Sequence, residues 1–327
     1  MEFFHGVDID WLGKKWYFLA FSLCFSVAGI VSMAYHWAHI GSPVPLGVDF
    51  RGGTQVEVQF QDRPDIAAIR KAIDHAGIRD AKIQQIGEAT RNDVLISLPE
   101  QKDENALDVG RQEVISALQS HYNNPFNQAG IKVDIVGPTV GRQLEGQAAR
   151  AVLYSLLGML VYLWFRFQLI YGVAAVIACF HDTLITVGAF SLASSAGFNM
   201  EINLTVVAAI LTLVGYSMND TIVVFDRIRE NLRLSRRENL GDLVNRSINQ
   251  TLSRTVLTSG LTFLTVLSLF IFGGQVLRGF SFALVIGILI GTYSSIAVAA
   301  PMLVAYQEWR ASKGKTVVLP AAKRART

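Results

Sequence analysis

The sequence predicts a polytopic α-helical membrane protein, with six transmembrane helices and an α+β domain inserted between the first two. Three observations lead to this fold class. Of the 327 residues, 51% are hydrophobic and only 17% are charged, and the mean hydropathy is +0.35. The apolar residues gather in long separate runs, and one helix needs roughly 20 such residues to cross a bilayer. One long stretch of ordinary polar sequence follows the first run.

Six runs are long and apolar enough to cross the membrane as helices. The expected spans are Trp16–Trp37, Ala148–Phe165, Leu169–Ser191, Leu204–Phe225, Ser253–Phe272 and Val276–Val304. The first run is long for a signal peptide, and aromatic residues flank it as an interfacial belt does, so we expect an uncleaved anchor. The two cysteines, Cys24 and Cys179, both fall inside spans, so we expect no structural disulfide between them.

The positions of Lys and Arg predict the orientation. They gather before the first span, between the fourth and fifth spans and in the C-terminal tail, and positive charge favours the cytoplasmic side. The predicted cytoplasmic parts are residues 1–15, an Arg-rich loop at 226–252 and a basic tail at 307–327. The first span is placed at 16–37, residues 38–145 outside the cytoplasm, and the other five spans within 146–306. We expect the tail to be solvated and not to bind nucleic acid.

The inserted segment contains four predicted strands and two predicted helices. Strict alternation of apolar and polar residues predicts strands, and Pro64 and Gly77 bracket the first helix. In chain order the elements are strand Thr54–Phe60, helix Pro64–His75, strand Ala81–Gly87, strand Asp93–Leu98, helix Asp103–Tyr122 and strand Ile131–Val136. This β-α-β-β-α-β order is that of the ferredoxin-like unit.

A glycine-rich motif, Gly47-Val-Asp-Phe-Arg-Gly-Gly53, precedes the first strand. The pair Gly52 and Gly53 indicates a tight turn or a close backbone approach, and Asp49 and Arg51 are its charged residues. A phosphate loop is not expected, because no Gly-Lys-Ser/Thr follows and no helix is predicted to start there. The chain therefore shows no nucleotide site and implies no cofactor, so energy must come from another chain or from an ion gradient.

Asp220 is the residue with the strongest functional signal, because it lies inside the fourth span. A carboxylate inside a bilayer costs several kcal/mol unless it is paired, hydrated or protonated, and such groups often handle protons. Tyr216 lies one turn away on the same face, and Asn219 is adjacent. The alternative is a carboxylate near a helix end that reaches interfacial water, since Arg227 follows soon after.

The fifth span carries a polar stripe with steps of three and four residues, which includes Arg254, Thr258 and Thr262. Because the fourth and fifth spans run in opposite directions, Asp220 and Arg254 are expected at similar depth and can pair. Either this pair has a functional role, or it is a salt bridge that only holds two helices together. A third interpretation places Arg254 outside the membrane, in the cytoplasm.

The third and sixth spans each carry one further feature, a polar pair in the third and a row of small residues in the sixth. His181 and Asp182 lie within the third span, and a role in proton handling or packing is favoured over metal binding, because no third ligand has compatible spacing. We expect no metal site. The sixth span has a small-residue ridge, Ala283, Gly287, Gly291 and Ser295, which predicts close packing against another helix.

Four of these stretches resemble the SecF family, whose members belong to the SecDF accessory complex of bacterial protein export. They are Gly47–Gly53, His181–Asp182 with Thr186–Gly188, Val214–Asn231 and Ser253–Ser259. Val214–Asn231 is highly specific and the others are supportive. The resemblance covers nearly the whole chain and implies six spans with a periplasmic domain after the first, as in one half of a resistance-nodulation-division transporter of the inner membrane.

The resemblance also implies partners and a mechanism. The partners are a SecD-like subunit, a SecYEG-type translocon and a translocating preprotein, within the lipid bilayer. In the family, the residues that match Asp220 and Arg254 are implicated in proton-driven work. The expected function is to use the proton gradient, with SecD, to promote late steps of preprotein export.

Other functions stay open on the residues alone. One is a small-molecule or lipid exporter of the same superfamily, which needs an apolar substrate cleft in the inserted domain. Another is a passive scaffold that holds translocon subunits together. An enzyme is not expected, because the sequence offers neither a nucleophile with a base nor a metal constellation.

Overall fold

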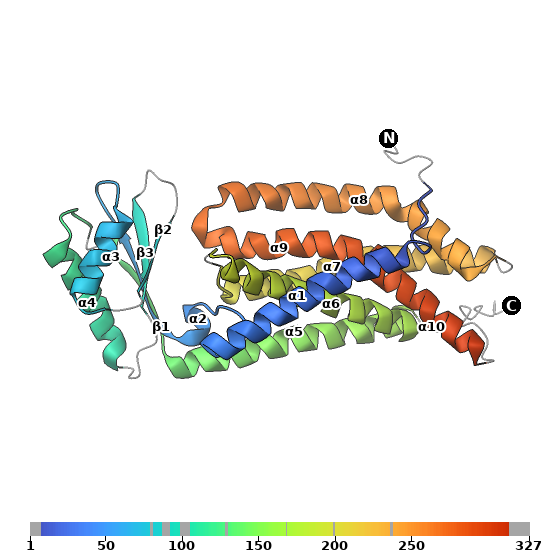
Figure 1. Ribbon diagram of the computed structural model, residues 1–327, viewed down its shortest axis with the longest axis horizontal. Helices are drawn as coiled ribbons and strands as arrows, with labels where there is room; N and C mark the ends of the chain where they lie inside the picture. Colours follow the sequence, from blue (N-terminus) through green and yellow to red (C-terminus); the bar gives the residue numbers. More distant parts are fainter. Residues whose placement is uncertain are drawn as a thin grey trace, which may run out of the picture.

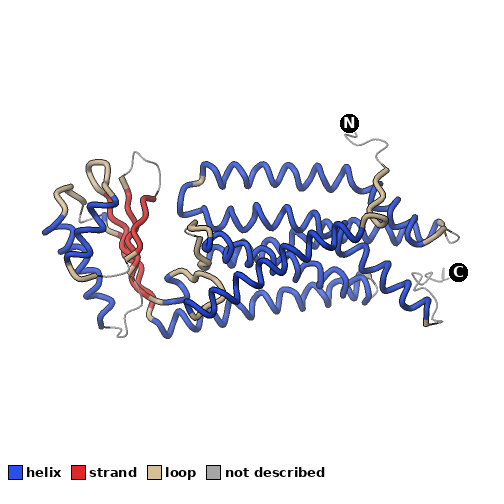
Figure 2. Tube along the Cα trace, in the orientation of Figure 1, coloured by secondary structure: helices blue, strands red, loops and turns tan. Residues whose placement is uncertain are grey.

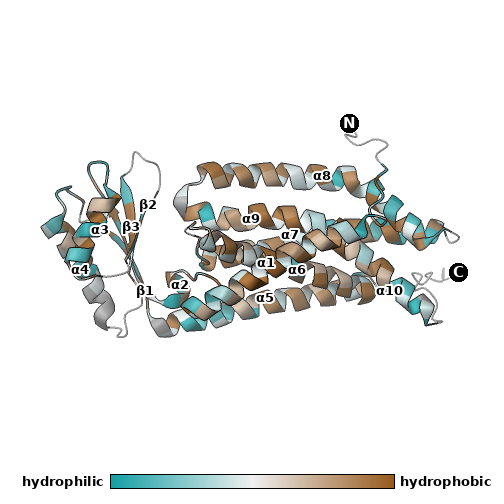
Figure 3. Ribbon diagram, in the orientation of Figure 1, coloured by the Kyte–Doolittle hydropathy of each residue, from teal (hydrophilic) through white to brown (hydrophobic). Residues whose placement is uncertain are grey.

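Six long apolar helices lie side by side, and a small α+β domain caps one end of them (Figures 1 and 2). In this computed structural model, the described residues are 8–78, 81–86, 92–98, 105–127, 130–167, 169–198, 200–235 and 238–313. The helices are apolar along most of their length, whereas the polar residues gather at the two ends and over the inserted domain (Figure 3). The predicted fold class is confirmed, because six helices are long and apolar enough to cross a membrane.

The spanning helices alternate in direction along the chain, so α1 and α6 run the same way. They are α1 (Lys15–Ile40), α5 (Pro138–Arg166), α6 (Leu169–Ser195), α7 (Leu204–Leu234), α8 (Leu240–Phe272) and α9 (Gly274–Ser294). Helix α9 continues through a π-helical segment, η2 (Ser295–Ala299), into α10 (Ala300–Ser312). Helices α6, α7 and α9 form the centre of the bundle, and α8 packs mainly against α7 and α9.

The Arg-rich segment predicted as a loop at 226–252 is mostly helical. Helix α7 continues to Leu234 and α8 begins at Leu240, so only a short turn separates them. Buried Ile228 and Leu243 pack between the two extensions, and the Asn231 amide donates to Ser247 Oγ at 2.8 Å. A span predicted from hydropathy ends where charged residues begin. An amphipathic helix can continue beyond that point, because one of its faces stays buried.

The inserted domain has the predicted ferredoxin-like topology. Its strands β1 (Gly53–Gln59), β2 (Lys82–Ile86), β3 (Asp93–Ser97) and β4 (Lys132–Val136) form an antiparallel sheet in the order β2-β3-β1-β4. Helices α3 (Ile66–His75) and α4 (Asn105–His121) pack on the sheet. Val56 and Val58 of β1 point into this core with Ile96 of β3, as alternation predicts. Gly87 and Asp103, at predicted element ends, lie outside the described residues.

The parallel pair α1 and α6 meets along small and polar residues. Three contacts share one register offset of 159 residues: Ser22 with His181, Gly29 with Gly188, and Ser32 with Ser191. At the middle contact the backbones approach so closely that a Cβ on Gly188 would lie 2.8 Å from Gly29 Cα. Small residues allow such close approach of helices in membranes, so these three contacts fix α1 against α6.

We predict that Gly188→Ala destabilises the protein by about 1–3 kcal/mol, because the added methyl group overpacks the contact with Gly29. Gly158→Ala on α5 is the matched control: its Cβ would meet nothing within 4 Å, and Ala favours a helix by roughly 0.5–1 kcal/mol. Thermal unfolding of the purified protein in detergent measures both. Equal melting temperatures for the two variants would show that the helices do not approach closely.

Candidate functional site

Asp182 lies where three central helices meet. It is carried by α6, its side chain is fully buried, and its Oδ2 accepts hydrogen bonds from Ser217 Oγ on α7 at 2.5 Å and Ser294 Oγ on α9 at 2.7 Å. A buried carboxylate is tolerated where hydrogen-bond donors surround it. This carboxylate therefore joins α6, α7 and α9 at one point.

His181 extends this cluster to the first helix. Its Nδ1 lies 3.0 Å from Asp182 Oδ1, and its Nε2 lies 2.5 Å from Ser22 Oγ on α1. One ring nitrogen of a neutral imidazole donates and the other accepts, so His181 can pass a proton between the serine hydroxyl and the carboxylate. The adjacent pair predicted from the sequence is thus a contact between side chains.

Asp220 is the second buried carboxylate of the bundle. It is 3% exposed, and its Oδ2 accepts from Ser259 Oγ on α8 at 2.6 Å and from Thr292 Oγ1 on α9 at 3.5 Å. Ser259 and Thr292 both line a cavity of about 320 Å³ beside α8 and α9. Asp220 therefore joins α7, α8 and α9.

The two carboxylates belong to one polar cluster. Ser217, which donates to Asp182, and Asp220 are three residues apart and share a face of α7. On α9, Thr292 donates a hydrogen bond to Asp220 and Ser294 donates one to Asp182. We call Asp182, Asp220 and their four hydroxyl donors, Ser217, Ser259, Thr292 and Ser294, the two-carboxylate cluster.

The expected pairing of Asp220 with Arg254 is not a direct contact: among the described residues, neither takes part in an ion pair with the other, and Arg254 is exposed. A pair requires both side chains to point toward each other around their helices, in addition to lying at similar depth. Five residues make nearly one and a half turns, so Arg254 points away from the side of α8 where Ser259 faces Asp220.

The other predicted polar residues form an exposed face on α7 and α8. Asn219, Arg254 and Thr258 are exposed at positions inside the apolar parts of these helices, and Thr262 is partly exposed. The Tyr216 hydroxyl is buried and has no hydrogen-bond partner among the described residues. We call Asn219, Arg254, Thr258 and Thr262 the polar face. Lipid tails offer no hydrogen bonds to such groups.

The glycine motif connects the inserted domain to α7. It contains one helical turn, α2 (Val48–Arg51), which the sequence did not predict. Asp49 Oδ2 accepts from the backbone N–H of Leu204, the first residue of α7, at 2.8 Å, and Gly47 N–H donates to Ile202 O at 2.8 Å. Gly52 and Gly53 both have a positive φ, which residues with side chains rarely adopt.

Two more contacts hold the motif in place. A Cβ on Gly141 of α5 would lie 2.6 Å from the carbonyl oxygen of Phe50, so only glycine allows α5 to pass so close. Lys82 of β2 forms an ion pair with Glu201, just before α7, and Arg51 lines the same cleft. The motif is therefore the junction between the inserted domain and the start of the helix that carries Asp220.

Sequence reasoning identified both carboxylates but not their hydroxyl donors. Two of the donors lie close to features noted in the sequence: Ser259 ends the Ser253–Ser259 stretch, and Ser294 precedes Ser295, the last residue of the predicted ridge. The ridge prediction itself is confirmed, because Gly287 faces Leu213 and Gly291 faces Ser217 on α7. Among the described residues, no group of three His, Cys, Asp or Glu side chains has a metal-binding arrangement.

This fold and site define a multi-pass membrane protein of the transport class, because hydrogen-bonded carboxylates inside a helix bundle mark proton and ion pathways. Residues 115–309 match the family described as protein export membrane protein SecD/SecF, C-terminal, and residues 40–62 match the SecD/SecF GG motif. The chain belongs to the SecF family of protein translocase subunits. This membership confirms that the chain is a transport subunit and not an enzyme.

Curated relatives match over nearly their full length. A protein translocase subunit SecF of Koribacter versatilis is 54% identical, over 98% of this chain and 96% of the relative. The SecF of Calditerrivibrio nitroreducens is 42% identical, over 90% and 93% of the two chains.

The fold also matches solved structures of SecDF. A crystal structure of SecDF, a translocon-associated membrane protein from Thermus thermophilus, is 36% identical and superposes with a TM-score of 0.75. The match covers 93% of this chain but only 39% of the solved one. A crystal structure of SecDF in a super-membrane-facing form gives a TM-score of 0.67 at 35% identity, over 94% and 40% of the chains. This chain thus spans about two fifths of the SecDF chains that it matches.

We predict that Asp49→Ala loosens the start of α7, because the Leu204 N–H loses its acceptor. Loss of such a cap costs about 1 kcal/mol. Amide hydrogen exchange near Leu204 should become faster. Asp49→Asn, which keeps a side-chain oxygen, is the control and should exchange almost as slowly as the wild type. Equal exchange rates in all three proteins would show that Asp49 does not cap α7.

Proposed function

We propose that this chain is the SecF half of a SecDF-type complex that uses the proton gradient to promote late steps of preprotein export. The observation that carries the proposal is Asp220, a buried carboxylate held by hydroxyl groups of α8 and α9. An elementary charge that moves through the membrane potential supplies about 2.3 kcal/mol per 100 mV. A titrating Asp220 would convert this energy into motion between helices.

The proton changes the hydrogen bonds that Asp220 can make. The ionised carboxylate only accepts, so both Ser259 and Thr292 donate to it, whereas the protonated form must also donate. A proton on Oδ2, the oxygen that accepts both hydrogen bonds, therefore requires at least one hydroxyl group to rotate or leave. The result is a two-state element between α7, α8 and α9 that one proton biases.

His181 and Asp182 serve as a second proton-accepting pair in this proposal. Asp182 shares α7 and α9 with Asp220, through Ser217 and Ser294. Repacking around one carboxylate therefore disturbs the donors of the other. Asn219, Thr258 and Thr262 support the relay from the polar face, and Tyr216 supports it from inside the bundle.

A SecD-like subunit is the proposed partner on the polar face. Arg254 and Asn219 are exposed at membrane depth, where a lipid-facing charge costs several kcal/mol. A second half with its own polar helices would cover this face. Arg254 would then act in the relay as a cation at the interface between the halves.

The inserted domain would follow the motion of α7. Asp49 and Ile202 attach the motif to the start of that helix, and Lys82 attaches the sheet to Glu201. Movement of α7 therefore reaches the domain directly. The domain would bind the emerging preprotein, and a SecYEG-type translocon would deliver it.

We place the chain in the bacterial inner membrane, with both termini and residues 226–252 in the cytoplasm and residues 38–145 in the periplasm. The segment before α1 supports one shared side, because the Trp11 indole donates to Asn249 of α8 at 2.9 Å. The positive charges assign that side to the cytoplasm. Residues 16–37 and 146–306 hold the membrane spans in this division.

Two other functions make different predictions. An exporter of small molecules or lipids needs an apolar substrate cleft in the inserted domain, whereas the cleft of about 480 Å³ where that domain meets the helices has Arg51, Lys82 and Glu201 among its lining residues. A passive scaffold needs the carboxylates only for stability. Titration of Asp220 separates the scaffold from the proton-driven subunit.

We predict that Asp220→Asn abolishes proton-gradient-dependent export in membrane vesicles but leaves assembly with the SecD-like subunit intact, because an amide cannot titrate. Asp220→Glu should keep part of the activity. Asp242→Asn, an exposed carboxylate in the first turn of α8, is the control and should export normally.

The double change Asp220→Asn with Arg254→Gln distinguishes the relay from a structural ion pair. If the two residues only neutralise each other, removing both charges is milder than removing one. We expect the double variant to be as inactive as Asp220→Asn. Export at a near wild-type rate would instead support the scaffold.

We predict that Ser235→Cys, in the turn between α7 and α8, resists an impermeant thiol reagent added outside intact cells stripped of the outer membrane. Asn124→Cys, in the inserted domain, should react. Cys24 and Cys179 are replaced first. The reverse labelling pattern would refute the orientation.

We also predict that Thr258→Cys on the polar face is protected from a membrane-permeant thiol reagent when the SecD-like subunit is present, and is labelled without it. Leu157→Cys, exposed on α5, is the control and should react in both cases. Equal labelling of Thr258→Cys with and without the subunit would mean that another surface forms the interface.

A further inference from the structure

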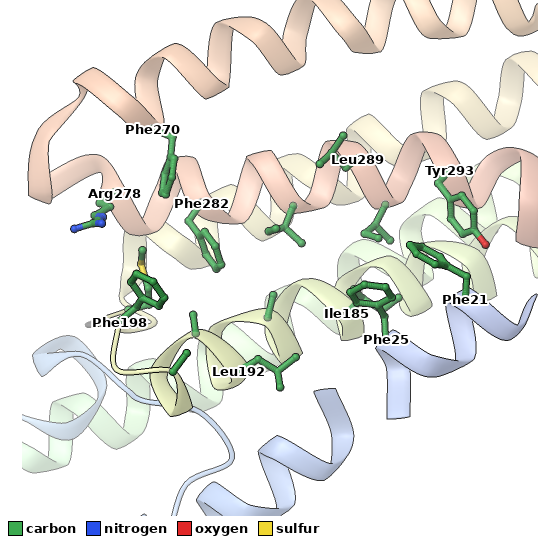
Figure 4. A pocket seen from close by; sticks show the side chains of 16 residues that line it. Phe21, Phe25, Ile185, Leu192, Phe198, Phe270, Arg278, Phe282, Leu289 and Tyr293 are labelled. Atoms are coloured by element: carbon green, nitrogen blue, oxygen red, sulfur yellow. The ribbon is translucent and has the colours of Figure 1, made fainter. Parts of the chain in front are cut away.

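A long groove runs along the outside of the helix bundle, away from the two-carboxylate cluster. Its walls are α1 and α9, its floor is α6, and its volume is about 830 Å³ (Figure 4). Phe21 and Phe25 of α1 line one wall, Phe282 and Leu289 of α9 line the other, and Ala189 and Ala193 of α6 line the floor. The groove is open sideways, because Phe21, Phe25 and Leu289 are between 44% and 49% exposed.

The two ends of the groove differ in chemistry. At the deep end the rings of Phe21 and Tyr293 meet at 5.4 Å between centroids, and the Tyr293 hydroxyl donates to Phe18 O at 2.5 Å, which closes the groove. At the other end lies Arg278, near the start of α9 (Figure 4). Among the described residues that line the groove, Arg278 is the only charged one.

Arg278 lies at the membrane face that carries the inserted domain. The following residue, Gly279, lies next to the backbone of Glu201, which pairs with Lys82 of the sheet. From Arg278 to Tyr293 the helix rises by about 22 Å, more than half of the roughly 30 Å hydrocarbon core. The groove thus runs from the depth of the lipid headgroups past the middle of the bilayer.

We propose that this groove binds one phospholipid of the outer leaflet, with an acyl chain between α1 and α9 and the phosphate on Arg278. Arg is suited to this role, because its planar guanidinium binds a phosphate with two parallel hydrogen bonds. An apolar channel with one closed end and one cationic end matches a molecule that has an apolar tail and an anionic head.

A helix of the partner subunit fits the groove less well than an acyl chain. The lining of the groove is apolar apart from Arg278 at one end and the Tyr293 hydroxyl at the other. Helix contacts in membranes also favour small and polar residues on both sides, whereas aromatic rings form these walls. The small and polar surface of the bundle is the polar face on α7 and α8, on other helices.

The site is independent of the proposed export function, because it involves neither carboxylate of the cluster. Tyr293 nevertheless follows Thr292, a donor to Asp220. A lipid in the groove therefore contacts the same turn of α9 that holds the cluster. Binding is measurable without any assay of export.

The test is native mass spectrometry of the complex with its SecD-like subunit, and of the chain alone. Each is first freed of lipid and then incubated with phosphatidylglycerol, phosphatidylcholine or diacylglycerol that carry the same acyl chains. We expect both preparations to retain one phospholipid of either kind more tightly than the diacylglycerol. Arg278→Gln should lower phospholipid retention roughly tenfold, as loss of a charge-assisted hydrogen bond predicts, and leave diacylglycerol retention unchanged.

Ala193→Trp should fill the groove and lower retention of all three lipids, and Ala189→Leu is a milder second variant if Ala193→Trp fails to fold. The matched controls are Leu157→Trp, exposed on α5, and Arg150→Gln, an exposed arginine on α5; both should retain lipid as the wild type does. Wild-type retention by the groove variants would overturn the proposal. So would retention by the isolated chain but not by the complex, because a partner subunit would then cover the groove.

Discussion

The arrangement of the central helices depends on the need of two buried carboxylates for hydrogen-bond donors. Asp182 and Asp220 lie within an apolar bundle, where an unpaired polar group costs several kcal/mol. Their donors come from α7, α8 and α9, so these helices must approach closely. Gly287 and Gly291 make that approach possible, because a Cβ at either position would press on α7. Because Gly287 and Gly291 have no side chains, Ser294 and Thr292 of the same helix come within hydrogen-bond distance of the carboxylates.

A single helix connects this cluster to the inserted domain. Helix α7 begins at Leu204, where Asp49 accepts its first N–H, and carries Asp220 about 24 Å further on. A helix transmits displacement along its axis, since its backbone hydrogen bonds keep its length constant. The glycine motif is bound to the first turn of α7, to α5 through Gly141 and to β1 through Gly53. The motif combines two glycines with unusual φ and one carboxylate because several backbones converge there.

The sequence predicted the spans, the sheet topology and both carboxylates, because each depends on a local property. Hydropathy marks spans, alternation marks strands, and an aspartate inside a span is rare. The partners of Asp220 were not predictable in this way, since Ser259 and Thr292 are two of many hydroxyl residues in these helices. Arg254 lies about 7.5 Å along α8 from Ser259, which contacts Asp220, and points in another direction around the helix. The helical extensions beyond Phe225 were missed because their outer faces are charged, and hydropathy averages over both faces.

The π-helical segment Ser295–Ala299 has a consequence for how the family is compared. A π turn holds one more residue than an α turn and arises as a single-residue insertion within a helix. Because each residue adds about 100°, such an insertion rotates everything that follows by that angle. In a regular α-helix Leu303 would lie about 120° around the axis from Gly291, and the extra residue of the π turn reduces this offset to about 20°. A relative with a regular helix here would need a one-residue gap at 295–299 for its C-terminal residues to align with those of this chain.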